Sequence, residues 1–433
     1  MNSDSAVYRP ESIRSYRDAA VYCIERLEAN DFAAYVVGGA VRDIFLERKI
    51  SDLDLATSAL PEEMHRVFSN FRMIDTGIEH GTVTLILPAA DKVNFHLEVT
   101  TFRVESTYSD ARHPDQVAFT NSLTEDLARR DLTINAMAWH PKNGIVDPYG
   151  GQKDLARRIL KAVGQPEKRF QEDALRILRT LRLAAELGFS IENHTEKALL
   201  DKQQRLLFVA PERLYVEFSR LLTGNYAVQV IDKYWQVIAV FLPEFNFFAN
   251  SEFRDQYLPQ LNQLSQLFVE RLAYLAAVFQ LEKKTASGPI PDQAASICRR
   301  LKCSKKMTEE LVLLSGYSAK SITATKISVD AVRQKLAAAD RSFEDILKLK
   351  KLLGQPDTQI KKLREIDLEL QAANLQGLKS LAIDGHDLIA MGFRGESVGT
   401  ALNRLYEAVL CEELANKKSA LLQRAETYKD LQN

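Results

Sequence analysis

The sequence predicts an α+β fold, in which a small N-terminal mixed α/β head precedes an elongated, all-helical remainder of the 433-residue chain. Up to about residue 150, short apolar runs with the period-two alternation of strands stand between helical patterns. Beyond Gly150–Gly151, apolar residues recur at i, i+3 and i+4, and strand patterns nearly vanish. Hydrophobic residues make up 46% and charged residues 27%, which excludes an intrinsically disordered chain.

Six elements are expected in the head, in the order helix, strand, helix and three strands. They cover residues about 12–30, 34–37, about 40–47, 51–57, 82–87 and 93–102. The second strand, SDLDLAT, alternates in polarity, so Leu53 and Leu55 share one face and Asp52 and Asp54 the other. The last two strands flank a short turn, which predicts a β-hairpin.

Prolines and glycines divide the rest of the chain into helices of ordinary length. We expect four segments, namely a head, a helical neck, a helical body and a helical tail. They span residues 1–150, 151–223, 224–350 and 351–433.

The sequence also excludes some classes of protein. No apolar run approaches the ~18 residues that a bilayer span needs, and the N-terminus lacks the apolar core of a signal peptide. The four cysteines are too few and too scattered for a disulfide framework. We therefore expect reduced thiols in a cytoplasmic protein that has no membrane partner.

Asp52 and Asp54 predict a metal site. They lie two residues apart on a strand, so both carboxylates leave the same face, and such paired hard oxygen ligands suit Mg²⁺ or Mn²⁺. Glu98 lies on the polar face of its own strand and becomes a third ligand if the two strands are neighbours. The alternative is a solvated strand edge, because a D-x-D pattern alone has little specificity.

Gly38 and Gly39 precede this strand, in the run VVGGAVRD. Two glycines between a strand and a helix let the backbone approach a phosphate group. Arg42 in the following helix is expected either to contact a triphosphate or to form an ion pair, and for Asp43 we favour the ion pair.

The segment RFQEDALRILRTLRLAAELGF is predicted to be one amphipathic helix. Helical spacing places Glu172 and Asp173 beside Arg176, which indicates either a surface ion-pair network or a base-reading site. A carboxylate only accepts hydrogen bonds and a guanidinium only donates them. Together they match the amino group and ring nitrogen of cytosine and adenine, and mismatch guanine and uracil. The pattern thus predicts selection of CTP and ATP without a template.

Five blocks of sequence, in order, resemble the motifs of class II tRNA nucleotidyltransferases, the CCA-adding enzymes of the polymerase-β-like nucleotidyltransferase superfamily. The blocks are VVGGAVRD with SDLDLAT, LARRDLTINAMA, VDPYGGQKDL, QEDALRILR and VAPERLYVEFSRLL. The match is dense in the head and neck and weak in the later helices.

The resemblance implies template-independent addition of C, C and A to the 3′ end of tRNA lacking all or part of its CCA. The substrates would be CTP and ATP, with two Mg²⁺ ions and pyrophosphate release. Asp52 and Asp54 would hold the metal, Arg130 and Asp131 would contact the ribose, and the tail would bind tRNA. The expected nucleotide-binding residues are Gly38, Gly39, Arg42, Arg130, Asp131, Glu172, Asp173, Arg176 and Arg179. No protein partner is implied.

The resemblance leaves several activities open. CC-adding relatives lack part of a flexible loop, whereas residues 105–119 are full length here and carry the family-like Asp110 and Arg112. CC addition alone is therefore disfavoured, and addition of A alone is not distinguished from complete CCA addition. Poly(A) polymerase is disfavoured by the TGIEHGTVTL run and the absence of a long basic tail. A non-catalytic RNA 3′-end binding protein is disfavoured by the intact Asp52 and Asp54.

The overall charge of -1 conceals an uneven distribution. Residues 281–365 contain 18 Lys and Arg against 10 Asp and Glu. Two basic clusters there, at 299–306 and 348–351, are expected either to follow tRNA phosphates or to be solvated helix faces.

Overall fold

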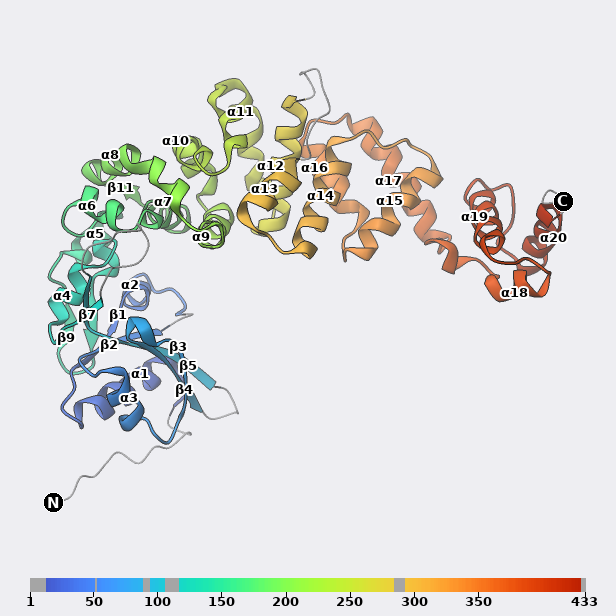
Figure 1. Cartoon of the computed structure of the whole chain (residues 1–433). Coiled ribbons are helices and arrows are strands. Elements are labelled where there is room, and N and C mark those ends of the chain that lie inside the picture. The colour runs from blue at the N-terminus through green and yellow to red at the C-terminus, as the bar shows by residue number, and fades with distance from the viewer. Residues whose placement is uncertain (1–12, 51–52, 89–93, 106–116, 284–292, 430–433) are drawn as a thin grey trace. The chain divides into compact units, whose positions relative to one another are not determined.

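The computed structural model describes residues 13–50, 53–88, 94–105, 117–283 and 293–429. The chain forms two compact units, residues 1–241 and 242–433, which are described separately (Figure 1). The finer division at residues 150, 223 and 350 stays a prediction.

Unit 1 begins with a seven-stranded sheet in the order β3-β4-β5-β2-β1-β8-β9. All neighbouring strands are antiparallel except β2 and β5, which are parallel. The strands are β1 (Ala34–Val37), β2 (Leu53–Thr57), β3 (Arg72–Gly77), β4 (Thr82–Pro88), β5 (Asn94–Thr101), β8 (Ala138–His140) and β9 (Gly144–Val146). Helices α1 (Tyr16–Glu28) and α3 (Pro61–Val67) pack against this sheet, and α2 (Gly39–Phe45) follows β1.

The strand at 34–37 and the β4–β5 hairpin confirm the sequence prediction. Leu53 and Leu55 are buried, as the alternation of SDLDLAT predicts. The sequence pattern does not predict strands β3, β8 and β9. Strands β8 and β9 are only three residues long, so they offer too few positions for a period-two pattern.

The remaining elements of unit 1 are two small sheets and a series of helices. A small sheet pairs β6 (Arg103–Glu105) with β7 (Val117–Phe119), and another pairs β10 (Ile159–Leu160) with β11 (Ser190–Ile191). The helices are α4 (Leu123–Ala128), the 3₁₀ turn η4 (Thr133–Asn135), α5 (Gly151–Arg157), α6 (Pro166–Glu172), α7 (Leu175–Leu187), α8 (Asn193–Lys202), η5 (Gln203–Phe208), α9 (Pro211–Thr223) and α10 (Ala227–Ala239).

The prediction of one continuous helix through QEDALRILR is wrong. Helix α6 ends at Glu172, and Asp173 has an extended backbone (φ -136°, ψ 107°). Its carboxylate Oδ1 accepts from the amide of Leu175, 3.0 Å away, at the start of α7. The short aspartate side chain satisfies a backbone donor that helix α7 leaves unpaired at its first turn, which stabilises the break.

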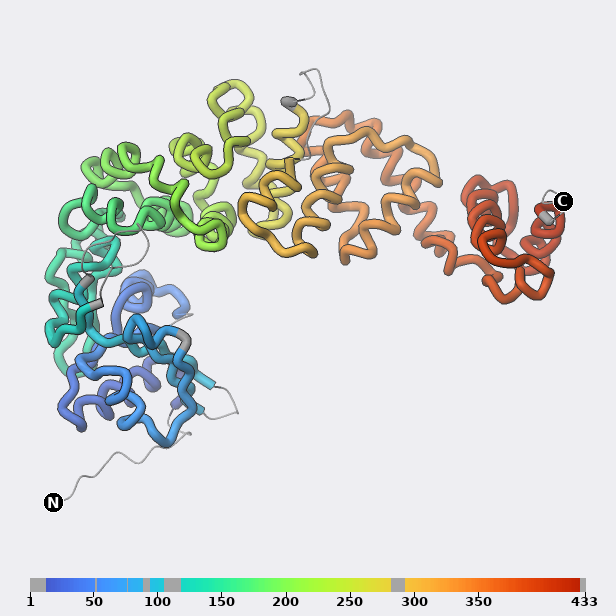
Figure 2. Tube along the Cα trace, in the orientation of Figure 1, coloured from blue at the N-terminus to red at the C-terminus, as the bar shows by residue number. Residues whose placement is uncertain are grey.

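Unit 2 is helical throughout its described residues (Figure 2). Phe245, Phe248 and Phe279 are fully buried and meet edge to face, with ring centroids 5.3–5.7 Å apart. The elements are η6 (Pro243–Ala249), α11 (Ser251–Tyr257), η7 (Leu258–Gln263), α12 (Phe268–Lys283), α13 (Gln293–Leu301), α14 (Lys305–Ala319), α15 (Lys326–Ala338), α16 (Phe343–Leu352), α17 (Asp357–Ala372), η8 (Leu378–Ser380), α18 (Gly385–Ala390), α19 (Glu396–Leu410) and α20 (Lys418–Lys429). No helix among the described residues is long and apolar enough to span a membrane.

Candidate active site

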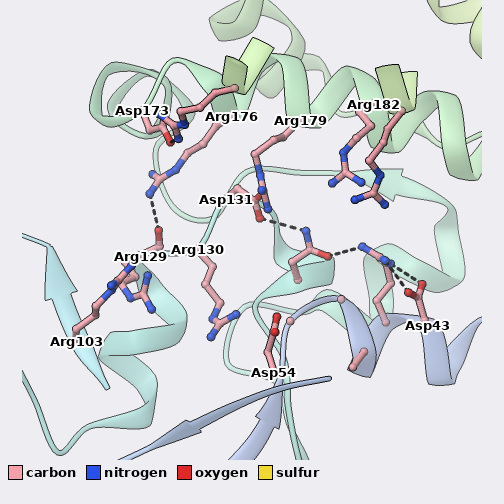
Figure 3. Close-up of a pocket in the computed structure, with 17 residues that line it drawn as sticks. Asp43, Asp54, Arg103, Arg129, Arg130, Asp131, Asp173, Arg176, Arg179 and Arg182 are labelled. Atoms are coloured by element: carbon pink, nitrogen blue, oxygen red, sulfur yellow. Dashed lines mark hydrogen bonds and ion pairs between the residues drawn. The ribbon is translucent and has the colours of Figure 1, made fainter. Parts of the chain in front are cut away.

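A cavity of about 490 Å³ opens within unit 1, lined by side chains from the sheet, the turn after β1 and helices α7 and α9 (Figure 3). Most of the predicted site residues line it, although they are spread over some 140 positions of the sequence. They are Gly38, Gly39, Arg42, Asp54, Arg130, Asp131, Asp173, Arg176 and Arg179. The predicted Asp52, Asp110 and Arg112 lie outside the described residues.

The turn between β1 and α2 forms one wall of this cavity. Gly38 has φ 75° and ψ -138°, a backbone conformation that residues with a Cβ rarely adopt. A Cβ at this position would lie 3.1 Å from Nη1 of Arg130 and 3.7 Å from Oδ2 of Asp54. Glycine therefore allows the backbone, a guanidinium and a carboxylate to share the same corner.

The carboxylates of Asp54 and Glu98 lie on neighbouring strands. Strands β2 and β5 pair in parallel with Asp54 directly beside Glu98, which confirms the strand adjacency on which the third-ligand hypothesis depends. Among the described residues, no three His, Cys, Asp or Glu side chains form a metal-binding group. The two hard oxygen donors nevertheless fit Mg²⁺, which usually binds one or two carboxylates and completes its shell with water and phosphate.

Arg129 and Arg130 share a buried partner, Asp126 of α4, whose side chain is fully buried. Asp126 accepts from Nη2 of Arg129 at 2.7 Å and from Nη2 of Arg130 at 3.0 Å. Burial opposes ionisation of Asp126, but the two guanidinium groups outweigh it and lower its pKa. Asp126 thus fixes Arg130 at the corner next to Gly38.

Asp131 makes a different set of contacts. Its Oδ2 accepts from Nε of Arg179 at 2.9 Å, and its Oδ1 accepts from the Leu132 amide and from Nδ2 of Asn135. Its neighbours in the sequence, Arg129 and Arg130, pair with Asp126 instead. Burial opposes the charge on Asp131, yet Arg179 and these donors hold its pKa well below the ordinary range. The same carboxylate raises the pKa of Arg179.

The predicted pairing of Asp173 with Arg176 is not formed. Asp173 instead accepts from Nη2 of Arg213 on α9 at 2.8 Å. Arg176 pairs with Glu172 at 2.8 Å, as predicted, and its Nη2 donates to the carbonyl of Arg129 at 3.0 Å. The break at Asp173 separates the two acidic side chains, so Glu172 pairs with Arg169 and Arg176 while Asp173 pairs with Arg213. Both Asp173 and Arg176 still line the cavity, whereas Glu172 does not.

Arg182 of α7 is held by acidic residues of α7 and α9. Arg182 pairs with Glu217 at 2.6 Å and with Glu186 at 3.1 Å, and Glu186 also pairs with Arg220 at 2.9 Å. Glu217 lies 3.5 Å from Arg179. Helix α9 therefore supports the cavity-lining face of α7.

Three further residues of the site are functional candidates that the sequence patterns do not indicate. Asp126 is a charged residue with a fully buried side chain, which no periodicity indicates. Asn135 lies in the run LTINAMA, whose pattern indicates packing. Arg220 is half-exposed and resembles an ordinary surface charge in the sequence, yet it lines the cavity.

One residue of the basic clusters of unit 2, Lys350, differs from the expectation. Lys350 is 1% exposed, and its Nζ donates to the carbonyls of Ser318 and Lys320 at the end of α14. It therefore stabilises the packing of α16 and does not face a phosphate. Arg300 is paired with the buried Glu244. Lys305 and Lys306 are exposed.

The chain is similar to known protein families in both of its units. A family model described as Poly A polymerase head domain matches residues 34–161, and a tRNA nucleotidyltransferase domain 2 model matches residues 285–425. A third model, described as "Probable RNA and SrmB- binding site of polymerase A", matches residues 188–248.

Curated relatives match over most of their length. The CCA-adding enzyme of Bacillus subtilis (strain 168) is 35% identical, covering 89% of this chain and 91% of that protein. The enzyme of Lactobacillus helveticus is also 35% identical, with 93% and 95% covered.

Solved structures of CCA-adding enzymes are also similar to this chain. The Bacillus stearothermophilus CCA-adding enzyme in complex with CTP matches with a TM-score of 0.71 and 28% identity, covering 95% of this chain and 97% of that one. The Thermotoga maritima enzyme complexed with tRNA, at 19% identity and a TM-score of 0.63, shares the fold. The chain thus belongs to the CCA-adding enzyme family, the tRNA nucleotidyltransferases of the poly(A) polymerase superfamily.

Proposed function

We propose that this chain adds C, C and A to the 3′ end of tRNA lacking all or part of its CCA, using CTP and ATP and releasing pyrophosphate. Its relatives carry the name CCA-adding enzyme, and its fold is similar to that of an enzyme crystallised with CTP. The observation that carries the proposal is one cavity with a carboxylate at one end and the Asp173 and Arg176 side chains at the other.

At the carboxylate end, Asp52 and Asp54 would hold two Mg²⁺ ions, with Glu98 as a further oxygen donor. When bound, such a pair of ions activates the attacking 3′ hydroxyl and neutralises the leaving pyrophosphate. Arg130 sits beside Asp54 with its guanidinium fixed by Asp126, so it is positioned to bind the triphosphate. Gly38 and Gly39 leave room for phosphate oxygens next to the backbone.

Asp131 and the start of α7 would bind the nucleoside. A carboxylate offers about four acceptor positions. Asp173 uses two of them within the described residues, for Leu175 and Arg213, so it can still accept from the amino group of cytosine or adenine. Arg176 would donate to the ring nitrogen. Arg213 and Glu172 would hold the two reading groups in place, a role that replaces the direct Asp173–Arg176 pair.

The test is sequencing of the 3′ ends made on three tRNAs, one ending before position 74, one after position 75 and one complete. Complete CCA addition predicts C, C and A on the first, A on the second and nothing on the third. Addition of A alone to the second, with the first unchanged, would instead make this an A-adding enzyme. Long A tracts would indicate a poly(A) polymerase.

Asp54 provides the first mutational test. Asp54→Ala should lower incorporation of labelled CTP and ATP by at least about a thousandfold, because removal of charge stabilisation at the transferring phosphate typically costs several kcal/mol. The exposed Asp201→Ala is the matched control and should retain activity. Wild-type incorporation by Asp54→Ala would refute the proposed metal site.

We also propose that the protein is located in the cytoplasm. All four cysteines are free thiols, which fits the reducing cytoplasm in which tRNA is processed.

A further inference from the structure

Asn135 is a polar residue that the proposed function does not use. It ends the 3₁₀ turn η4, lines the cavity and is 7% exposed. Its Oδ1 accepts from Nη1 of Arg42 at 2.8 Å, and its Nδ2 donates to Oδ1 of Asp131 at 3.2 Å. Dashed lines at Asp131 in Figure 3 mark this connection. The amide thus joins a residue from the glycine turn to the proposed ribose-binding carboxylate.

The chemistry of the two partners explains the amide. Arg42 can only donate and Asp131, when ionised, can only accept. An amide presents one acceptor and one donor group, so it satisfies both. A carboxylate at position 135 would suit Arg42 but repel Asp131, and an apolar side chain would leave two buried charged groups without these hydrogen bonds. The assignment of oxygen and nitrogen within the amide follows from the same argument.

Asn135 also restricts how Asp131 can bind a ligand. The Leu132 amide and Asn135 share Oδ1, while Arg179 takes one position on Oδ2. Of about four acceptor positions on a carboxylate, three are therefore taken within the described residues. The remaining acceptor position is on Oδ2, the oxygen to which Asn135 does not donate. The orientation of the carboxylate then decides where a hydroxyl can bind.

We propose that Asn135 is a positioning residue that sets the preference for ribonucleotides over 2′-deoxynucleotides, by fixing Asp131 so that Oδ2 accepts from the ribose 2′ hydroxyl. This inference rests on the proposed function. The inference goes beyond the proposed function because it assigns the selection of the sugar to the hydrogen-bonded side chains of Arg42, Asn135 and Asp131. Asn135 acts through Asp131 and does not itself contact the sugar.

The experiment compares kcat/KM for CTP and dCTP on tRNA lacking its CCA, at several pH values. Wild-type incorporation of CTP checks the proposed function separately. Asn135→Ala should lower the CTP preference over dCTP by roughly tenfold, about the value of one missing hydrogen bond to a charged group. Most of the loss should fall on CTP, because dCTP has no 2′ hydroxyl to misplace. Asn250→Ala is the control, since that side chain accepts from the Phe253 amide at the start of α11, outside the cavity, and its loss should leave the ratio unchanged.

Asn135→Asp supplies a readout that general damage to the fold would not give. Its new carboxyl lies beside the Asp131 carboxylate, and like charges at this distance raise the pKa of one of the pair. Once protonated, it can donate to Asp131 and accept from Arg42, which restores both hydrogen bonds. The CTP preference of the variant, relative to wild type, should therefore recover as the pH falls from 8 to 6. The charged groups on the surrounding elements are Arg42 and Asp43 on α2, Asp131, Arg179 on α7, and Asp154 on α5, which accepts from Thr133.

The results of these two variants decide whether Asn135 positions Asp131. Loss of sugar preference in Asn135→Ala, with recovery at low pH in Asn135→Asp, supports the positioning role. Equal loss of CTP and dCTP use in both variants, or an unchanged ratio, overturns it. If Asn135→Asp does not fold, as judged by its thermal unfolding, the sugar ratio of Asn135→Ala decides. If wild type itself adds no CTP, the proposed function fails instead.

Discussion

At the scale of single residues, the site depends on charged side chains whose orientation is fixed by buried partners. Asp126 is the clearest case, because it holds Arg129 and Arg130 from a position with no solvent exposure. Such an arrangement costs desolvation energy and contributes little net stability compared with an apolar core. Its benefit is geometric, since the guanidinium of Arg130 that Asp126 binds lies at the corner next to Gly38. Asp131, which is also buried, fixes the guanidinium of Arg179 in the same way.

We expect Asp126→Asn to weaken nucleotide binding. The amide keeps the shape of the side chain but loses the charge that attracts two guanidinium groups, so Arg130 should become mobile. The KM for CTP and ATP should rise about tenfold, while the KM for tRNA changes less. The free energy of unfolding should fall by about 3 kcal/mol, as for other broken buried ion pairs. Steady-state kinetics and urea unfolding measure the two effects. Asp330→Asn, a buried ion-paired aspartate of unit 2, is the control and should lose stability without a change in the KM for CTP.

The lowered pKa of Asp131 predicts the sign of a pH effect on stability. Because burial is outweighed by Arg179, Asn135 and the Leu132 amide, the folded chain favours the ionised carboxylate more than the unfolded chain does. The contribution is complete above the unfolded pKa of about 3.9 and is lost as the pH falls toward the lower folded value. Asp131→Asn should therefore lose less stability than wild type between pH 6 and pH 3, by about 1 kcal/mol. Urea unfolding at both pH values checks this. An identical pH loss in wild type and variant, with the exposed Asp201→Asn as reference, would contradict it.

At the scale of elements, the junction of α6 and α7 is the feature that the sequence pattern concealed. An uninterrupted helix would place Asp173 beside Arg176, whereas the break turns Asp173 toward Arg213 on α9. Three elements then meet at the start of α7, because Arg176 also binds the carbonyl of Arg129 beyond α4. Nucleotide selection by this junction would depend on the position of α9 as much as on α7.

This geometry makes Arg213 a test of nucleotide choice. Arg213→Ala should leave Asp173 without its guanidinium partner, so the carboxylate can rotate away from the base. The ratio of kcat/KM for CTP over UTP should fall by about tenfold, near the value of one specific base contact. Asp173→Ala should reduce the same ratio at least as much, and both should leave the KM for tRNA nearly unchanged. Arg205→Ala is the control, since Arg205 binds a carbonyl of α6 outside the cavity. An unchanged CTP/UTP ratio in both test variants would remove this junction from nucleotide selection.

At the scale of the whole molecule, local patterns predicted the fold class, and long-range partners limited the prediction of the site. The strand at 34–37 and the placement of Asp54 and Glu98 on the polar faces of their strands followed from alternation within short runs, whereas the pairing of these two strands came from the structure. Arg213, the partner of Asp173, is by contrast 40 positions away, and Arg42, one of the two partners of Asn135, is 93 positions away. No helical or strand period connects such residues. The sequence showed which side chains carry chemistry, whereas their pairing required the tertiary structure.

The uneven charge of the chain predicts where salt should affect tRNA binding. Lys305 and Lys306 are exposed at the start of α14, whereas Lys350, from the second cluster, is buried. If the first cluster binds phosphates, replacing both lysines by alanine should raise the KM for tRNA several-fold but not that for CTP. The slope of log affinity against log salt should also become shallower, by about one for every phosphate that the variant no longer binds.

Lys350→Met provides the matched control from the second cluster. Because Lys350 donates to the carbonyls of Ser318 and Lys320, its loss should lower the Tm of unit 2. It should leave the salt slope unchanged, since a buried ammonium group releases no counterion from RNA. Filter binding of tRNA at a series of salt concentrations gives both slopes. Equal slopes for wild type and the Lys305/Lys306 variant would mean that this basic face is merely solvated, and that the tRNA-binding charges of unit 2 lie elsewhere.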